Sequence, residues 1–280
     1  MEKVIISNPE NFEEIKQKII SGGAENFHVL ADFDRTLTKA SVDNKIHSTI
    51  AILRNENYLS EEYSKKAFAL ADYYHPIEFN PEIPLEEKKK HMQEWWKKHF
   101  DLLFEYGLNK NHLKRLIDEE RIKFREGALE FFDLLHEKGI PLVIISSSPV
   151  GDLIEISLKK YGKLCDNVKI VTNLYKWDKD GNAIGVNEPI IHVFNKDETI
   201  LKDLPEIYNE VKDRKNVLLL GDSLGDLGMI EGFDYDNLLK VGFLNYDVDA
   251  NLERYKNNFD VVIRNDSDMN FVNEFVKEIK

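Results

Sequence analysis

Two aspartates separated by one residue, Asp32 and Asp34, follow the apolar run 27–31. On an extended chain, residues i and i+2 point the same way. Two carboxylates on one side repel each other, so a cation lies between them or one of them keeps a proton. Magnesium fits, because it is a hard divalent ion that prefers oxygen ligands and commonly accompanies phosphate. An isolated Asp-x-Asp can equally be a turn with a capping aspartate, so the pair needs support from elsewhere in the chain.

A second acidic pair, Asp222 and Asp226, lies in the segment 221–226 directly after the apolar run 217–220. The glycines of this segment permit a tight turn from a strand into a helix, and acids four residues apart can share one helical face. A helix cap after a strand would explain one aspartate but not both. The pattern therefore predicts further oxygen ligands for a metal ion.

Three serines, residues 146–148, follow the apolar run 142–145 and precede Gly151 and Asp152. Alone they indicate an ordinary polar loop. Between a strand and a helix, however, their hydroxyls and backbone N–H groups could bind an anion. Lys196 likewise follows an apolar stretch, where a lysine is usually a solvated residue at the edge of a sheet.

The elements that must position these clusters support a shared site, because three of the clusters lie just beyond the carboxyl ends of apolar strands. In open parallel sheets, ligands bind at that edge. Short apolar strands alternate with helices along the chain, which predicts an α/β fold with a Rossmann-like, doubly wound and largely parallel sheet. Beyond the three strands already named, strands are expected at 168–171, 238–243 and 260–263, and helices at 9–22, 126–137 and 152–160.

Residues 41–120 differ in composition, with few β-branched runs and many Lys, Glu, Leu, Tyr and Trp. We expect a helical insertion here, and a catalytic core formed by residues 1–40 and 121–280. Helices should open near Ser60 and Leu85, and the prolines at 76, 81 and 84 should break the chain between them. Aromatic pairs in such helices usually pack in a core, but they could stack on a base if the insertion faces a phosphate site.

The composition restricts the partners. The 280 residues carry 38 Lys and Arg against 51 Asp and Glu, a formal net charge of −13. Such a chain is a poor nucleic-acid binder and can hold an anionic substrate only at a local positive site. A single cysteine excludes an internal disulfide, and no apolar run approaches the ~20 residues needed to span a bilayer. Since the first residues also lack the apolar region of a signal peptide, we expect a soluble, cytoplasmic monomer without nucleic-acid or membrane partners.

The motifs together resemble a known family. Residues 32–37, Ser146, Lys196 and residues 221–226 look like the four motifs of the haloacid dehalogenase superfamily. Longer strings resemble the cytosolic 5'-nucleotidase III (pyrimidine 5'-nucleotidase) family in order along nearly the whole chain. These strings are residues 73–78, 94–99, 125–127, 191–196 and 242–245. Residues 191–196, Ile-His-Val-Phe-Asn-Lys, form the most specific of them.

The resemblance implies a mechanism. Asp32 would attack the phosphorus of a nucleoside 5'-monophosphate and become an aspartyl-phosphate. Asp34 would protonate the leaving ribose oxygen and then help to deprotonate the hydrolytic water. Ser146, chosen because it directly ends its strand, and Lys196 would neutralise the transferring phosphoryl group together with the metal.

The resemblance also implies the ligands of the metal and of the base. Mg²⁺ would be bound by Asp32, the main-chain carbonyl of Asp34 and Asp222, with Asp226 supporting the site. The insertion 41–120 would be a cap that recognises the base. Candidate substrate ligands are His47, Glu78, Trp95, Trp96 and Ser147.

The expected function is therefore that of a 5'-nucleotidase acting on pyrimidine or 7-methylguanosine monophosphates, with phosphoryl transfer to a nucleoside as a further activity. Two alternatives remain open. One is a phosphatase for a non-nucleotide ester such as phosphoserine or a sugar phosphate. The other is a non-catalytic phosphate-binding protein, although a decayed site usually loses its nucleophile or a metal ligand.

Overall fold

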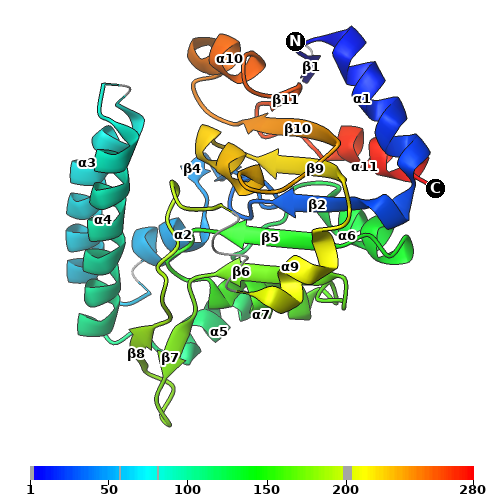
Figure 1. Cartoon of the computed structure of the whole chain (residues 1–280). Helices are drawn as coiled ribbons and strands as arrows, with labels where there is room; N and C mark the ends of the chain where they lie inside the picture. Colours follow the sequence, from blue (N-terminus) through cyan, green and yellow to red (C-terminus); the bar gives the residue numbers. More distant parts are fainter. Residues whose placement is uncertain (1–2, 57, 81, 198–203) are drawn as a thin grey trace.

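One mostly parallel sheet forms the centre of the molecule (Figure 1). The computed structural model describes residues 3–56, 58–80, 82–197 and 204–280. Among these residues the strand order of the sheet is β1-β11-β10-β9-β2-β5-β6, and only the pairing of β1 with β11 is antiparallel. The strands are β1 (Val4–Ile6), β2 (Phe27–Ala31), β5 (Leu142–Ser146), β6 (Val168–Thr172), β9 (Asn216–Gly221), β10 (Asn237–Leu244) and β11 (Val261–Arg264). This confirms the predicted α/β fold.

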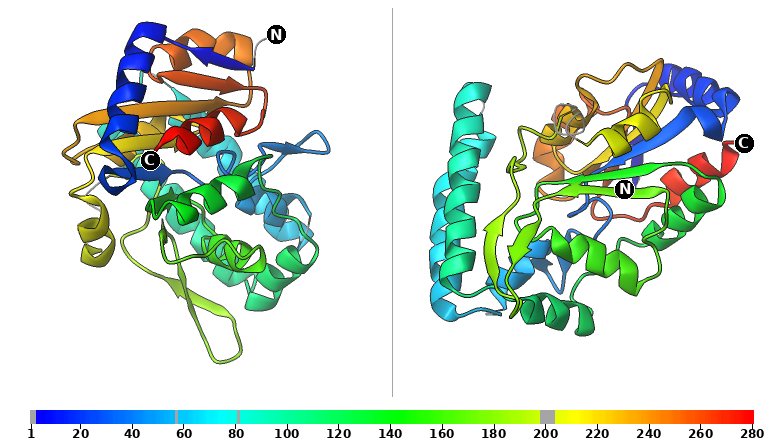
Figure 2. Two further views of the ribbon diagram at one scale, coloured as in Figure 1. Left: turned by 90° about the vertical axis from the view of Figure 1, so that its right-hand side faces the viewer. Right: turned by 60° about the horizontal axis from the view of Figure 1, so that its bottom comes forward.

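Both faces of the sheet are buried, as expected for strands that read as continuous apolar runs. Along β2, Val29 and Ala31 contribute to the core on one face and Leu30 to the core on the other. Helices from different parts of the chain cover each face (Figure 2). Helices α1 (Pro9–Gly22), α6 (Ala128–Glu137), α7 (Asp152–Lys160) and α11 (Asn270–Glu278) pack on one core; α9 (Pro205–Val211), the 3₁₀ helix η2 (Leu224–Ile230) and α10 (Val248–Lys256) pack on the other. The sheet is therefore doubly wound.

The first helix shows why the local sequence signals were informative. The Asn8 side chain accepts a hydrogen bond from the Asn11 backbone N–H at 3.2 Å, and Pro9 occupies the first helical position. Gly23 ends the helix with a φ of 71°, which favours glycine. The short 3₁₀ helix η1 (Ala24–Asn26) then leads directly into β2.

Residues 41–120 are largely helical. They hold the short hairpin β3 (Ser41–Val42) and β4 (Lys45–Ile46), followed by α2 (Thr49–Asn55), α3 (Glu61–Phe79), α4 (Leu85–Glu105) and α5 (Lys110–Asp118). Helices α3 and α4 pack side by side and stand beyond the carboxyl ends of the sheet strands (Figures 1 and 2). None of the described helices is both long and apolar enough to cross a membrane.

The prolines of this region correct one prediction. Ser60 caps α3 as expected, since its hydroxyl accepts the backbone N–H of Tyr63 at 3.0 Å. Pro76, however, does not break the chain: α3 continues to Phe79, and the Asn80 N–H donates to the Pro76 carbonyl at 3.1 Å. An exposed proline within the last turn removes one helical hydrogen bond without opening the turns before it. Pro84 directly precedes α4, and Pro81 lies outside the described residues.

A second hairpin, β7 (Tyr175–Trp177) and β8 (Ala183–Val186), projects from the core after β6 and packs against α4. It connects the serine loop, defined as residues 146–151, to the helices beyond the sheet. The candidate active site lies between the carboxyl ends of the strands and the helices α3 and α4 (Figure 1).

Candidate active site

The three polar clusters meet because their strands are neighbours. In the sheet, β2 lies between β9 and β5, and all three strands run parallel. The backbone N–H of Asp32 donates to the Leu220 carbonyl at 3.0 Å, which joins the ends of β2 and β9 directly. The aspartates after β2 and β9 and the serines after β5 therefore share one edge of the sheet.

The carboxylates of Asp32, Asp222 and Asp226 form the centre of this edge, with ligand oxygens that all lie within 4.8 Å of one another. Lys196 lies among them: its ammonium group donates to Asp226 at 2.9 Å and also to Asp32. Burial opposes the charge of Lys196, but the two carboxylates outweigh it and raise the pKa of the amine. The lysine is therefore a fixed positive charge in the acidic cluster.

The same burial acts on the acids. Desolvation raises the pKa of Asp32 well above its usual range, while Lys196 opposes this shift. Desolvation likewise raises the pKa of Asp222 to about 6, against the attraction of Arg35. Buried carboxylates that repel one another are stabilised by a cation between them. An all-oxygen donor set of this kind fits Mg²⁺.

Asp34 points elsewhere, because both of its oxygens are bound by Thr49. The Thr49 backbone N–H donates to Oδ1 at 2.9 Å, and the Thr49 hydroxyl donates to Oδ2 at 2.6 Å. Its side chain is thus not one of the three clustered carboxylates, which leaves the main-chain carbonyl as the group it could offer a metal. Sequence reasoning missed Thr49, although the polar pair Ser48-Thr49 before the apolar run 50–53 is a helix start.

The loop after Asp32 is held in place by a buried arginine, Arg125. Arg125 donates to the Thr36 carbonyl at 2.7 Å and to the Arg35 carbonyl, and the Asn245 amide donates to the same Arg35 carbonyl at 3.0 Å. These contacts hold Arg35 at a φ of 64°, a conformation that non-glycine residues rarely adopt. Its side chain then reaches Asp222, with Nε 3.2 Å from the carboxylate.

The serine loop is equally well supported. Ser146 is buried, and its hydroxyl accepts the backbone N–H of Ser148 at 3.1 Å. The amide of Asn173 donates to the Ser148 carbonyl at 3.2 Å and to the Ser147 carbonyl at 3.3 Å. At Gly151 an added Cβ would lie 2.4 Å from the Asn173 carbonyl oxygen, so only glycine fits this close approach.

Two of the predicted base ligands, Trp95 and Trp96, are neighbours on α4, and one of them contacts the serine loop. The indole N–H of Trp96 donates to the Ser147 carbonyl at 2.7 Å, which joins the helix to the serine loop. The ring of Trp95 stacks on Tyr74, with centroids 5.6 Å apart and planes at 12°. Among the described residues, the buried indole N–H of Trp95 makes no hydrogen bond.

The other two predicted base ligands lie apart from this pair. Glu78 is in the last turn of α3; burial raises its pKa to about 7, and the nearby Arg35 opposes the shift. His47 is buried after β4, and its Nε2 accepts the backbone N–H of Lys123 at 3.3 Å. The structure therefore brings Glu78 toward the acidic cluster and holds His47 against the core.

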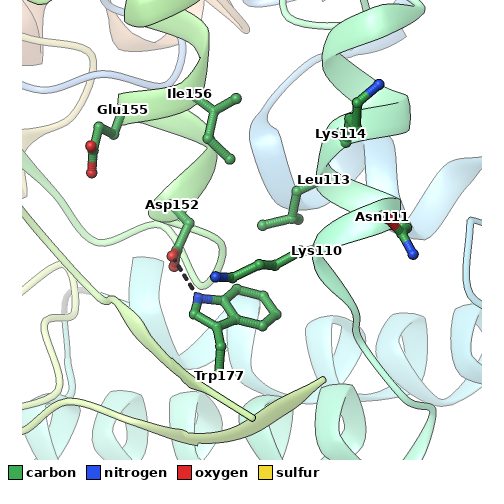
Figure 3. Close-up of a pocket in the computed structure, with 8 residues that line it drawn as sticks. All are labelled: Lys110, Asn111, Leu113, Lys114, Asp152, Glu155, Ile156 and Trp177. Atoms are coloured by element: carbon green, nitrogen blue, oxygen red, sulfur yellow. Dashed lines mark hydrogen bonds between the residues drawn. The ribbon is translucent and has the colours of Figure 1, made fainter. Parts of the chain in front are cut away.

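A groove of about 370 Å³ is lined by residues of α5, the start of α7 and Trp177 of β7 (Figure 3). There the Trp177 indole N–H donates to Asp152 at 3.0 Å, and the Lys110 ammonium lies 5.5 Å from the centroid of the Trp177 ring. Asp152 also accepts the backbone N–H of Tyr175 at 3.1 Å. The groove contains none of the clustered acids; its contacts tie the hairpin β7–β8 to the first residue of α7.

The mostly parallel sheet, with aspartates, serines and a lysine at one edge, has the haloacid dehalogenase-like fold. The crystal structure of a substrate-bound phosphoserine phosphatase shares the fold, with a TM-score of 0.56 over 90% of this chain and 97% of that chain. The sequence identity of 21% limits this likeness to the fold.

More specific comparisons identify the family. A sequence model described as "Pyrimidine 5'-nucleotidase (UMPH-1)" matches residues 35–280, so the chain belongs to this family. The 7-methylguanosine phosphate-specific 5'-nucleotidase A of Xenopus laevis is 36% identical over 272 residues, which cover 96% of this chain and 93% of the relative. The crystal structure of cytosolic 5'-nucleotidase IIIB bound to cytidine is similar over 100% of this chain and 94% of that chain, with a TM-score of 0.87 and 30% identity.

Proposed function

We propose that this protein is a magnesium-dependent 5'-nucleotidase that uses Asp32 as its nucleophile. The observation that carries the proposal is the buried cluster of Asp32, Asp222 and Asp226 around Lys196, at the sheet edge where α/β proteins bind ligands. Membership in the pyrimidine 5'-nucleotidase family narrows the phosphate ester to a nucleotide.

In the first step, a carboxylate oxygen of Asp32 attacks phosphorus, and the bond from phosphorus to the ribose 5'-oxygen breaks. The electron pair goes to that oxygen, which takes a proton from Asp34, so that the nucleoside leaves with its hydroxyl restored. Lys196, which bonds Asp32, and Ser146 would bind the phosphoryl oxygens and stabilise the charge of the transition state.

In the second step, water attacks the phosphorus of the aspartyl-phosphate and gives its proton to Asp34. The bond between phosphorus and the Asp32 oxygen breaks, which releases phosphate and restores both side chains. Magnesium held by Asp32, Asp222 and the Asp34 carbonyl, with Asp226 alongside, would supply positive charge to the phosphoryl oxygens.

We further propose that residues 41–120 are the cap domain, with residues 1–40 and 121–280 as the catalytic core. Glu78 and the aromatic residues Trp95 and Trp96 would recognise the base, Ser147 would help to bind the substrate, and His47 would support the cap where it joins the core. A carboxylate and aromatic rings in the same cap would suit the positively charged 7-methylguanine base as well as cytosine. We therefore expect 7-methylguanosine monophosphate and CMP among the substrates, as the names of the relatives suggest. We also expect a monomer that acts in the cytoplasm.

The substrate class is tested by a turnover screen with Mg²⁺ across CMP, UMP, dUMP, AMP, GMP and 7-methyl-GMP, with phosphoserine and sugar phosphates as non-nucleotide esters. The proposal expects CMP and 7-methyl-GMP to be turned over fastest. Equal or faster turnover of the non-nucleotide esters would instead support the alternative phosphatase.

The nucleophile is tested by Asp32→Asn, which removes the attacking oxygen but keeps the shape of the side chain. We expect hydrolysis of every ester to be abolished while the circular dichroism spectrum stays unchanged. Retained turnover in the folded variant would refute the assignment of Asp32.

A further inference from the structure

Asp34 is bound by a chain of hydrogen bonds that joins the two sides of the site. The Thr49 hydroxyl lies 2.6 Å from Oδ2 of Asp34 and, on its other side, 2.6 Å from the hydroxyl of Ser148. The Ser148 hydroxyl in turn accepts the backbone N–H of Val150 at 3.1 Å. Thr49 begins α2, and Ser148 belongs to the serine loop, so these hydrogen bonds connect residues that are 99 positions apart in the sequence.

The directions of these hydrogen bonds follow from counting protons. A hydroxyl has one proton to donate and two lone pairs that accept. When Asp34 is ionised, the Thr49 hydroxyl must donate to it, so Ser148 is the donor to Thr49. The order is then Val150 N–H to Ser148, Ser148 to Thr49, and Thr49 to Asp34. Because Thr49 and Ser148 are both buried, water does not readily substitute for either hydroxyl.

We propose that Thr49 is a positioning residue for the acid–base Asp34, and that Ser148 orients the Thr49 hydroxyl. The proposal rests on the function proposed above, in which Asp34 is an acid in one step and a base in the next. A hydroxyl suits both states, because it donates to the carboxylate and can accept the Oδ2–H of the carboxylic acid until that proton passes to the leaving oxygen. The backbone N–H of Thr49 can only donate, so it keeps Oδ1 as an acceptor and leaves Oδ2 to carry the transferred proton.

The test compares two substrates that differ in one atom. A nucleoside 5'-monophosphate needs its leaving oxygen protonated, whereas the analogue with sulfur in the bridging position releases a thiolate that does not. For Thr49→Val, which keeps the size and the N–H, we expect kcat/KM for the oxygen ester to fall about 10- to 100-fold. The value for the sulfur ester should fall less than about 3-fold, because kcat/KM reports only the steps up to formation of the aspartyl-phosphate.

Three further variants complete the design. Thr49→Ser keeps the hydroxyl and should restore the oxygen ester to within about 3-fold of the wild type. Ser148→Ala should give a smaller loss of about 3- to 10-fold, again confined to the oxygen ester. Ser157→Ala removes a buried hydroxyl that bonds the Leu153 carbonyl within α7, and it should change neither ester.

Equal losses on the two esters in Thr49→Val, no loss on either ester, or failure of Thr49→Ser to restore activity would overturn the positioning role. Should Thr49→Val not fold, Ser148→Ala carries the same comparison, since it leaves Thr49 in place. A wild-type enzyme inactive toward the nucleotide would refute the proposed function itself and the positioning role with it. If the wild type hydrolyses the nucleotide but the variants lose activity equally on the oxygen and sulfur esters, only the positioning role is refuted.

Discussion

Lys196 is a local positive charge in a chain whose formal net charge is −13. It is almost fully buried, and its ammonium group bonds Asp32 and Asp226 instead of solvent. A positive charge placed in such a site interacts more strongly than one in water, because the surroundings screen it less. Lys196 therefore supplies a fixed positive charge within the acidic cluster, whatever the charge of the surface.

Glu78 allows a prediction on pH. Its pKa rises from 4.5 to about 7 in the folded protein, because burial penalises the charged form. Between these values the folded protein binds more protons than the unfolded chain, so the contribution of Glu78 to stability is lost as the pH rises toward 7. Glu78→Gln cannot ionise and escapes this loss. The difference in melting temperature, variant minus wild type, should therefore be larger at pH 8 than at pH 5. Thermal unfolding in EDTA measures it.

The matched control is Glu94→Gln on α4. Glu94 is exposed, and its hydrogen bond with Lys98 lowers the pKa of its carboxyl, so it stays ionised throughout this range. Its effect on the melting temperature should be the same at pH 5 and pH 8. A Glu78→Gln effect that is equally independent of pH would contradict the raised pKa.

Several residues of the site were predictable because they follow strands that are themselves visible in the sequence. Asp32, Ser146 and Asp222 each come directly after an apolar run, and the carboxyl ends of parallel strands meet at one edge. Thr49 and Asn173 were not predictable, since their roles depend on contacts with residues 15 and about 25 positions away that leave no local pattern. From the sequence, Arg125 is identified only as part of residues 125–127, which resemble the nucleotidase family. Its contacts with the loop after Asp32 are visible in the structure alone.

At the scale of elements, the core strands were predicted within one or two residues because both of their faces are buried. The edge strand β1 was not predicted: it has three half-buried residues and pairs antiparallel with β11. A strand this short gives no measurable periodicity. Pro76 was misjudged for a related reason, since the cost of a proline depends on its position in a helix whose end is not visible in the sequence.

Arg125, which precedes α6, connects the loops that follow β2 and β11, so it is a suitable test at this scale. Its guanidinium bonds the carbonyls of Thr36 and Ser267 at 2.7 Å each and lies 3.0 Å from Asp266. Arg125→Met would leave these buried carbonyls and the acid without their donor. We expect the free energy of unfolding to fall by about 3–5 kcal/mol, as for other broken buried ion pairs, in a chemical denaturation measurement.

The comparison variant is Arg115→Met on α5. This arginine is exposed and pairs with Glu119 four residues on, an interaction that solvent screens and that should contribute little to stability. A similar small loss for Arg125→Met would show that water replaces its hydrogen bonds and that the loop after Asp32 does not depend on them.

At the scale of the whole molecule, the site lies where the core sheet faces α3 and α4 (Figure 1). The hydrogen bond from Trp96 to Ser147 joins α4 to the core, and that from Thr49 to Asp34 joins α2 to it. The acidic cluster concentrates the charge of the chain at this junction, where Asp32, Asp222 and Asp226 repel one another. Removing that repulsion should stabilise the entire fold.

Binding of Mg²⁺ should therefore raise the melting temperature. A ligand that binds only the folded state adds about 2.7 kcal/mol of stability at a concentration 100 times its dissociation constant, and each kcal/mol shifts the melting temperature of a chain this size by about 2–4 °C. We expect a rise of about 5 °C or more in MgCl₂ relative to EDTA. Since salt alone screens a net charge of −13, the reference is NaCl at the same ionic strength. Asp222→Asn removes one ligand from the cluster, so this variant should lose the part of the rise in melting temperature that is specific to Mg²⁺. Two results would show that the three carboxylates do not bind the ion: an equal rise of the wild type in NaCl, or an undiminished rise of the variant in MgCl₂.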